Sequence, residues 1–209
     1  MPAKQDKGSH CWLNSEAFSH GKNMLITHER EKLINAILYF ARHTQYLGKI
    51  KLFKLLYLLD FEHFRQTGQS VTGLTYSAWK YGPVPVALAQ EWDELEPDLA
   101  AAIAIRPEQV IDYERQTIAP LIEFDDSHFS KRELRIMAEL VSQYGKEYSP
   151  KMIDVTHTEN GAWIKVWNDG KGFNQRISYD LAIADDEPYR DAILEAAKEY
   201  QAIANSARC

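Results

Sequence analysis

Four lysines lie close in the sequence to aromatic side chains, and this combination could bind a charged partner. The residues are Lys49, Lys51, Lys54 and Lys80, with Trp79 and Tyr81 on either side of the last. Lysines interleaved with aromatic rings suit nucleic acid, because ammonium groups pair with phosphates and the rings stack on bases. The same lysines could instead lay their apolar stems over a helix face and keep their ammonium groups in water. The residues alone favour this second interpretation.

One polar pair stands on a single predicted helix. Asp60 and His63 are three residues apart, so their side chains could meet on the helix surface. A polar pair on a helix flank is more often structural than catalytic. Other catalytic signatures are missing, since the sequence contains no glycine-rich loop before GK[ST] and no GxSxG elbow. We therefore expect a protein that is not an enzyme and that needs no cofactor.

Composition narrows the classes of partner. The net charge of −6 at pH 7 weighs against a general nucleic-acid binder, although it leaves room for a local basic patch. The histidines show no HExxH or His-x-His spacing, so no metal site is predicted. Cys11 and Cys209 lie at opposite ends of the chain, which suits free thiols in the cytoplasm. No apolar run approaches the roughly 18 residues that a membrane span needs.

The run over residues 51–84 contains the elements that would position these groups. Its leucines repeat at the spacing of one helix face, and they are Leu52, Leu55, Leu56 and Leu59. Gly68 stands where this helix would end. The following LTYSAW segment predicts a short strand. The sequence GPVP at 82–85 then breaks the chain, and a new helix could begin on a proline there.

Further helices are predicted on both sides of this run. The first covers about 28–43 with Thr27 as its N-cap, and another covers about 85–95 and is ended by Pro97. Ser130 and Glu133 form a capping box that begins a helix ended by Gly145. Three later segments are also predicted to be helical, at about 149–156, 162–168 and 188–204.

The region between residues 98 and 124 is the hardest to interpret. The sequence EQVIDYER at 108–115 suggests a short helix. Pro120 limits the alternating pattern at 117–124 to an edge strand or a linker. Any boundary between subdomains would lie here.

A DNA-binding unit is the main alternative for the second half of the chain. Helix, turn, short helix, turn and short helix over 130–168 is the order found in helix-turn-helix and winged-helix domains. The last of these, AWIKVWN, offers only Lys165 and Asn168 to bases or phosphates. A recognition helix normally presents more polar side chains, so the pattern favours core or protein contacts for its two tryptophans.

The chain resembles the SocA/Panacea antitoxin-domain family, which includes phage-associated proteins of the GepA type. The first group of matching residues is Lys51-Leu52, Lys54-Leu55-Leu56-Tyr57, Asp60, Gly73, Ala78-Trp79 and Tyr81-Gly82-Pro83-Val84. The second group is the capped helix from Ser130, Tyr144-Gly145, Thr156-His157, Glu159, Trp163 and Ile177-Ser178. The chain departs from the family at Ala162, where proline is common. The resemblance covers about residues 30–180.

This resemblance implies an antitoxin that neutralises a cognate protein toxin by direct binding, and one type of family member delivers its toxin to a protease. It implies no catalytic residues. We expect the partner surface at Trp79, Lys80, Tyr81, Gly82 and Pro83, with Lys51 and Lys54 beside them. Three alternatives stay open: Trp79 could close the core beneath the loop, the protein could be a DNA-binding transcriptional regulator as well as or instead of an antitoxin, and, more remotely, it could be an unrecognised hydrolase.

The expected fold is α+β and mostly helical. It is a compact multi-helix domain with about six to eight helices and one small β-sheet or hairpin. Residues 1–23 read as a loose N-terminal tail, residues 24–185 as the antitoxin-like domain, and residues 186–209 as a C-terminal helix and end.

Overall fold

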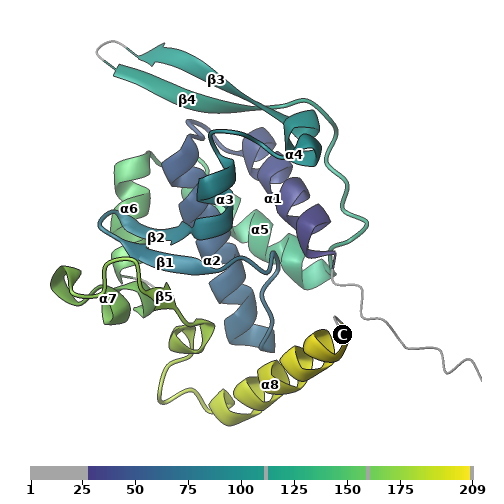
Figure 1. Ribbon diagram of the computed structural model, residues 1–209, viewed down its shortest axis with the longest axis vertical. Helices are drawn as coiled ribbons and strands as arrows, with labels where there is room; N and C mark the ends of the chain where they lie inside the picture. The colour runs from purple at the N-terminus through teal and green to yellow at the C-terminus, as the bar shows by residue number, and fades with distance from the viewer. Residues whose placement is uncertain (1–27, 111–112, 159–160, 208–209) are drawn as a thin grey trace, which may run out of the picture.

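The described residues form eight α-helices and two small antiparallel sheets (Figure 1). The structure is a computed structural model, and it describes residues 28–110, 113–158 and 161–207. This architecture confirms a mostly helical α+β fold. It holds two sheets where one was expected. The predicted tail at 1–23 and the predicted N-cap Thr27 lie outside the described residues.

Helix α2 (Lys49–Thr67) is the centre of the fold. It is buried on every side, as expected for a helix whose apolar residues are not confined to one stripe. Helices pack around it (Figure 1), among them α1 (Glu29–His43), α5 (Lys131–Tyr144) and α6 (Ser149–Thr158). The predicted capping box of α5 is confirmed, because the Ser130 amide donates to Glu133 Oε2 at 2.6 Å and Ser130 Oγ accepts from the Glu133 amide at 3.3 Å.

The three-stranded sheet joins segments that are far apart in the sequence. Its order is β2 (Gly82–Pro85), β1 (Tyr76–Trp79) and β5 (Arg176–Ile177). Tyr76 pairs with Pro85 on one side and with Ile177 on the other. Tyr76 and Ala78 are buried in the core, while Trp79 at the end of β1 is exposed.

The predicted helix at 108–115 is wrong, because this region is part of a hairpin. Strand β3 (Ile103–Val110) pairs with β4 (Tyr113–Pro120), and Ile105 lies opposite Ile118. Pairing of the two strands stabilises the extended conformation of this region more than its local sequence pattern stabilises a helix. Proline is tolerated in both strands because a two-stranded sheet has only edge strands. The hairpin extends past the helices at one end of the molecule (Figure 1).

The boundaries around the third predicted helix also differ. Pro85 ends β2, so α3 is shorter and covers Val86–Glu91. Pro97 does not end that helix but begins α4 (Pro97–Ala102), at the position where a missing N–H costs nothing.

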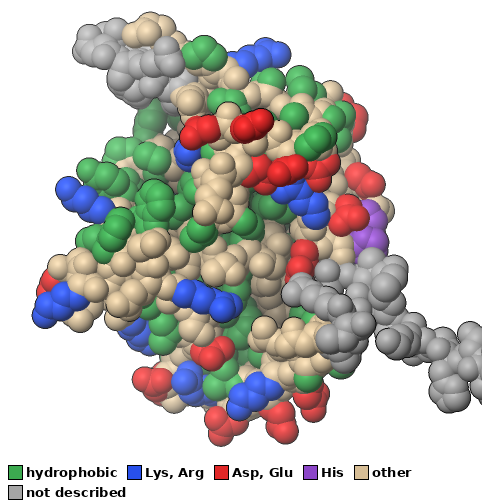
Figure 2. Space-filling view, in the orientation of Figure 1, with side chains coloured by type: hydrophobic (Ala, Val, Ile, Leu, Met, Phe, Trp, Pro, Cys, Tyr) green, Lys and Arg blue, Asp and Glu red, His purple; other side chains and the backbone are tan. Residues whose placement is uncertain are grey.

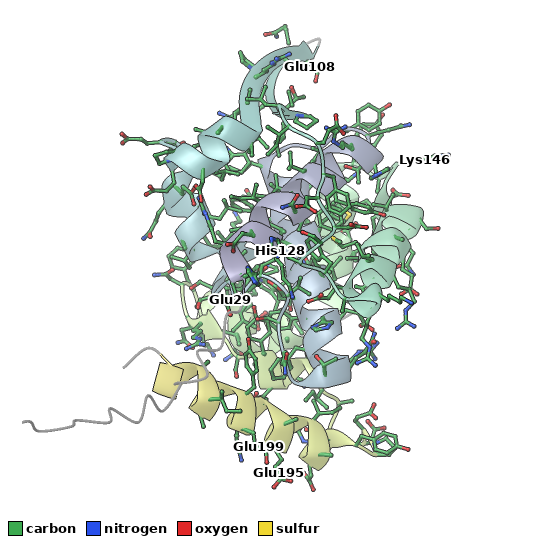
Figure 3. All side chains as sticks on the ribbon, turned by 90° about the vertical axis from the view of Figure 1, so that its right-hand side faces the viewer. Glu29, Glu108, His128, Lys146, Glu195 and Glu199 are labelled. Atoms are coloured by element: carbon green, nitrogen blue, oxygen red, sulfur yellow. The ribbon has the colours of Figure 1, made fainter. Side chains whose placement is uncertain are left out.

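The last part of the chain first packs against the three-stranded sheet and then ends in a helix that lies away from it. It contains α7 (Ala162–Trp167), the 3₁₀ turns η1 (Asn168–Gly170) and η2 (Tyr179–Ala182), and α8 (Arg190–Ala207). Helix α8 lies at the end of the molecule opposite the hairpin (Figure 1), and Glu195 and Glu199 point away from the body (Figure 3). The amphipathic pattern of this last helix predicts that Tyr189 and Ile203 face inward, but their side chains are 71% and 53% exposed. Nowhere in the described part of the chain does a helix combine the length and the apolar composition that crossing a membrane requires.

Gly68 ends α2 and packs against the backbone of α8. Its replacement by alanine should lower the free energy of unfolding by about 1–2 kcal/mol. Gly68 has φ 75°, and a Cβ there would lie 2.6 Å from the Ile193 carbonyl oxygen of α8. Gly161→Ala is the matched control, because Gly161 has φ 64° and nothing within 4 Å of its Cβ position. Urea denaturation should show a larger loss for Gly68→Ala, with faster amide exchange in α8. Equal losses would contradict this close contact.

Candidate functional site

The β1–β2 turn carries the residues that the sequence nominated for a partner surface. Trp79 pairs with Gly82, so Lys80 and Tyr81 form the turn between the strands. Neither turn residue has a positive φ, whereas Gly82 follows with φ 102°. A turn of this kind followed by a left-handed glycine is a common way to close a hairpin.

The side chains at the tip of this turn point into solvent. Trp79 is 41% exposed and Tyr81 is 60% exposed. Lys80 is also exposed, and its Nζ lies 5.4 Å from the centroid of the Tyr81 ring. The alternative in which Trp79 closes the core is therefore wrong. Tyr76 and Ala78 of the same strand close it instead.

Gly82 and Pro83 support the turn from below and are buried. Lys54 Nζ donates a hydrogen bond to the Pro83 carbonyl oxygen at 2.7 Å. A Cβ on Gly82 would lie 2.8 Å from Lys54 Nζ and 2.9 Å from Thr156 Oγ1, so only glycine lets the backbone approach these groups. Burial lowers the pKa of Lys54 to about 7. Lys54 therefore holds the turn in place from inside the protein.

Both interpretations of the lysines, a basic patch and ammonium groups kept in water, are wrong for Lys51 and Lys54, because these side chains are buried, at 0% and 2% exposure. Lys51 Nζ donates to the carbonyl oxygens of Gln45, Gly145 and Glu147, at 2.9, 3.0 and 2.7 Å. These bonds replace water around the ammonium group, although burial still lowers the pKa of Lys51 to about 8. Lys51 thus joins the α1–α2 linker to the α5–α6 linker.

Trp79 is held by two bonds to residues of the second half of the chain. Its carbonyl oxygen accepts from Trp163 Nε1 at 3.1 Å, and its own Nε1 donates to Asn174 Oδ1 at 3.3 Å. Trp163 in turn stacks on His157, with ring centroids 3.8 Å apart and an angle of 4° between the planes. His157 and Trp163 therefore form a structural corner beside the end of β1.

Phe173 belongs to this site although sequence reasoning missed it. Its ring centroid lies 6.4 Å from that of Trp79, and the side chain is 60% exposed. Main-chain bonds hold its loop beside β1, because the Ala78 amide donates to Gln175 and the Asn174 amide donates to Ala78, at 2.9 and 2.8 Å. An aromatic residue directly after Gly172 was the available signal. Trp79, Tyr81 and Phe173 are called the aromatic face below.

The space-filling view places hydrophobic side chains on the same side of the molecule. They gather over the region of α6 and the β1–β2 turn, with Lys or Arg side chains at the edge of the group (Figure 2). An exposed group of aromatic rings on a rigid support is typical of protein-binding surfaces.

Asp60 and His63 do not form a surface pair. Asp60 is fully buried, and its carboxylate accepts from the Val71 and Thr72 amides and from the Thr72 and Tyr76 hydroxyls, at 2.5–2.9 Å. Burial raises the pKa of Asp60 to about 6, although these bonds act in the opposite direction. His63 Nδ1 instead bonds the Gln69 carbonyl oxygen at 2.7 Å. Both side chains hold the segment between α2 and β1.

Helix α7 does not have the form of a DNA recognition helix. It contains six residues, and Ala162 and Trp163 at its start are buried. It lies against β1, β5 and α6 rather than projecting from the fold. Lys165 is exposed on it, but the helix has no free polar face to place in a groove.

The comparisons with known proteins identify one family. The family model described as antitoxin SocA-like, Panacea domain, matches residues 52–164, just over half of the chain. The match runs from α2 to α7 and includes the β1–β2 turn, while Phe173 lies beyond it. No curated protein and no solved structure matches the chain.

Proposed function

Because this chain belongs to the antitoxin SocA-like, Panacea-domain family, we propose that it neutralises a cognate protein toxin by direct binding in the cytoplasm. The observation that carries this proposal is the exposure of Trp79 and Tyr81 on a turn that the interior holds rigidly. In this proposal the toxin is occluded by contact, and the chain performs no chemistry on it.

The aromatic face has the properties of a binding hot spot. Tryptophan and tyrosine contribute strongly to protein interfaces, because each buries a large area and loses little side-chain freedom. The bonds to Trp163, Asn174 and Lys54 already order this region, so little conformational entropy remains to be lost on binding.

The buried polar groups of α2 support binding over catalysis. Lys54 is buried and bonded to the backbone, and Asp60 accepts bonds at both of its oxygens. Neither group lies in a cleft where a substrate could reach it. The role of both in this proposal is to shape the surface.

Co-expression with the protein encoded by the neighbouring gene tests the proposal. The wild-type chain should restore growth of cells that express that protein. Trp79→Ala and Tyr81→Ala should each weaken binding by about 30-fold, which corresponds to about 2 kcal/mol for a hot-spot residue. Binding of the purified proteins gives the affinity, and growth gives the rescue.

Tyr189→Ala is the matched control, because Tyr189 is 71% exposed and lies next to α8, away from the turn. It should leave rescue unchanged, and thermal unfolding should show that all three variants fold. A wild-type chain that fails to rescue growth overturns the antitoxin proposal. If both turn variants still rescue growth, Trp79 and Tyr81 do not form the binding surface.

A further inference from the structure

The segments that build the aromatic face have a charge opposite to that of the whole chain. They are Trp79–Gly82, Ala162–Trp167 and Lys171–Arg176, and together they contain four cationic residues and no Asp or Glu. The complete chain has 30 acidic and 24 basic residues and a net charge of −6. Between α7 and β5 the only acidic residue is Asp169. The segments that carry the exposed rings, and α7 packed against them, are therefore locally positive in an acidic protein.

Three of these cations can reach a bound partner. Lys80, Lys165 and Lys171 are exposed, and no ion pair between described residues engages any of them. Lys80 is in the turn itself, Lys165 is on α7, and Lys171 is two residues before Phe173. The fourth cation, Arg176, lines the cleft beside α8 instead.

We propose that the aromatic face binds a segment of the partner protein in which an apolar anchor is flanked by carboxylates. The anchor would pack on Trp79, Tyr81 and Phe173, while the carboxylates would pair with the three lysines. This inference rests on the proposed antitoxin function and names the chemistry of its partner. Its support is charge complementarity, which favours encounter with an acidic segment and disfavours a basic one.

The geometry favours protein over nucleic acid at this face. Lys80 already lies over the Tyr81 ring, and the Trp79 ring is tilted by 41° from that of Phe173. The rings thus offer no parallel series of free faces on which bases could stack. Three lysines would also neutralise few phosphates on a chain with net charge −6.

Charge reversal on the aromatic face tests this inference. The variant Lys80→Glu, Lys165→Glu, Lys171→Glu should bind the purified product of the neighbouring gene about 30-fold or more weakly at about 0.05 M salt. The loss should shrink at about 0.5 M salt, because screening weakens exposed charge pairs. Trp79→Ala should instead lose affinity at both salt concentrations.

The control variant Lys131→Glu, Lys146→Glu, Lys198→Glu changes the net charge by the same amount on other exposed positions. Lys146 lies on the α5–α6 linker (Figure 3), and this variant should bind within about threefold of wild type. The inference alone is overturned if the charge-reversal variant of the aromatic face binds with wild-type affinity. It is also overturned if the control variant loses as much affinity as that variant.

Two further outcomes separate the inference from its alternatives. Absence of any complex with the wild-type chain would overturn the antitoxin function together with this inference. A duplex of the promoter region could also be bound by the wild-type chain and lost on reversal of the three face lysines. If the protein complex were unaffected by the same reversal, the face would be a nucleic-acid site and the inference would fail.

Discussion

At pH 5, replacing Asp60 by alanine is expected to lower the free energy of unfolding by about 3–5 kcal/mol. The change leaves the Val71 and Thr72 amides without an acceptor and removes the partner of the Thr72 and Tyr76 hydroxyls. Each buried donor left unpaired costs about 1–3 kcal/mol. Urea denaturation followed by circular dichroism measures the loss.

Asp60→Asn is the matched control for this change, because its amide oxygen can still accept from the two backbone amides. It also tests the charge. The folded pKa of about 6 lies above the ordinary value of 3.8, so the folded protein keeps the proton while the unfolded chain has lost it. Wild-type stability should therefore fall by about 2 kcal/mol relative to Asp60→Asn as the pH rises from about 4 to about 7. Parallel pH curves for the two proteins would contradict the raised pKa.

Replacing Lys54 by methionine is expected to remove a pH dependence of opposite sign. The folded pKa of about 7 lies below the ordinary value of 10.5, so between these values the unfolded chain binds a proton that the folded protein does not. Stability therefore rises with pH across this window. Between about pH 7 and pH 9.5 wild type should gain about 3 kcal/mol relative to Lys54→Met.

The comparison with the variant is needed because Lys51, with its pKa lowered to about 8, produces a slope of the same sign. Lys198→Met on the exposed face of α8 is the control and should retain the wild-type slope. If Lys54→Met retains the slope as well, the buried ammonium group is not its source. Methionine also leaves the Pro83 carbonyl without its Lys54 donor, so under the proposed function this variant should weaken binding of the partner.

These two residues belong to a series of polar side chains on α2 that hold the surrounding loops. Lys51 bonds the linkers before α2 and after α5, and Lys54 bonds the β1–β2 turn. Asp60 and His63 bond the segment that leads from α2 to β1. The buried helix therefore positions the exposed turn through its polar groups as well as through its apolar core.

Local patterns were sufficient for several elements of this fold. The leucine spacing of α2, its end at Gly68 and the Ser130–Glu133 capping box all depend on residues within a few positions of one another. The order of motifs was likewise sufficient for the family, because the turn and the helices around it keep their spacing along the chain.

Contacts between distant residues determined the rest. The hairpin of β3 and β4 arises from cross-strand pairs, and five of them, from Ile103 with Pro120 to Pro107 with Gln116, have both partners outside the 108–115 window. From the sequence alone, Lys51 and Lys54 are expected at the surface. Their burial could not be predicted locally, because the carbonyl groups that they bond, at Pro83, Gly145 and Glu147, belong to distant segments. Burial of an ammonium group is tolerated only when such acceptors converge on it.

The candidate site also has a part that local sequence determines and a part that only the tertiary structure determines. The sequence was enough to nominate Trp79, Tyr81 and the glycine–proline bend, because a tight turn and its residue types are local properties. Folding alone placed Phe173 beside Trp79 and brought α7 and the 172–175 loop against β1. Such a surface depends on which chain segments meet, and the hydrogen bonds between β1 and the 172–175 loop are formed only in the tertiary structure.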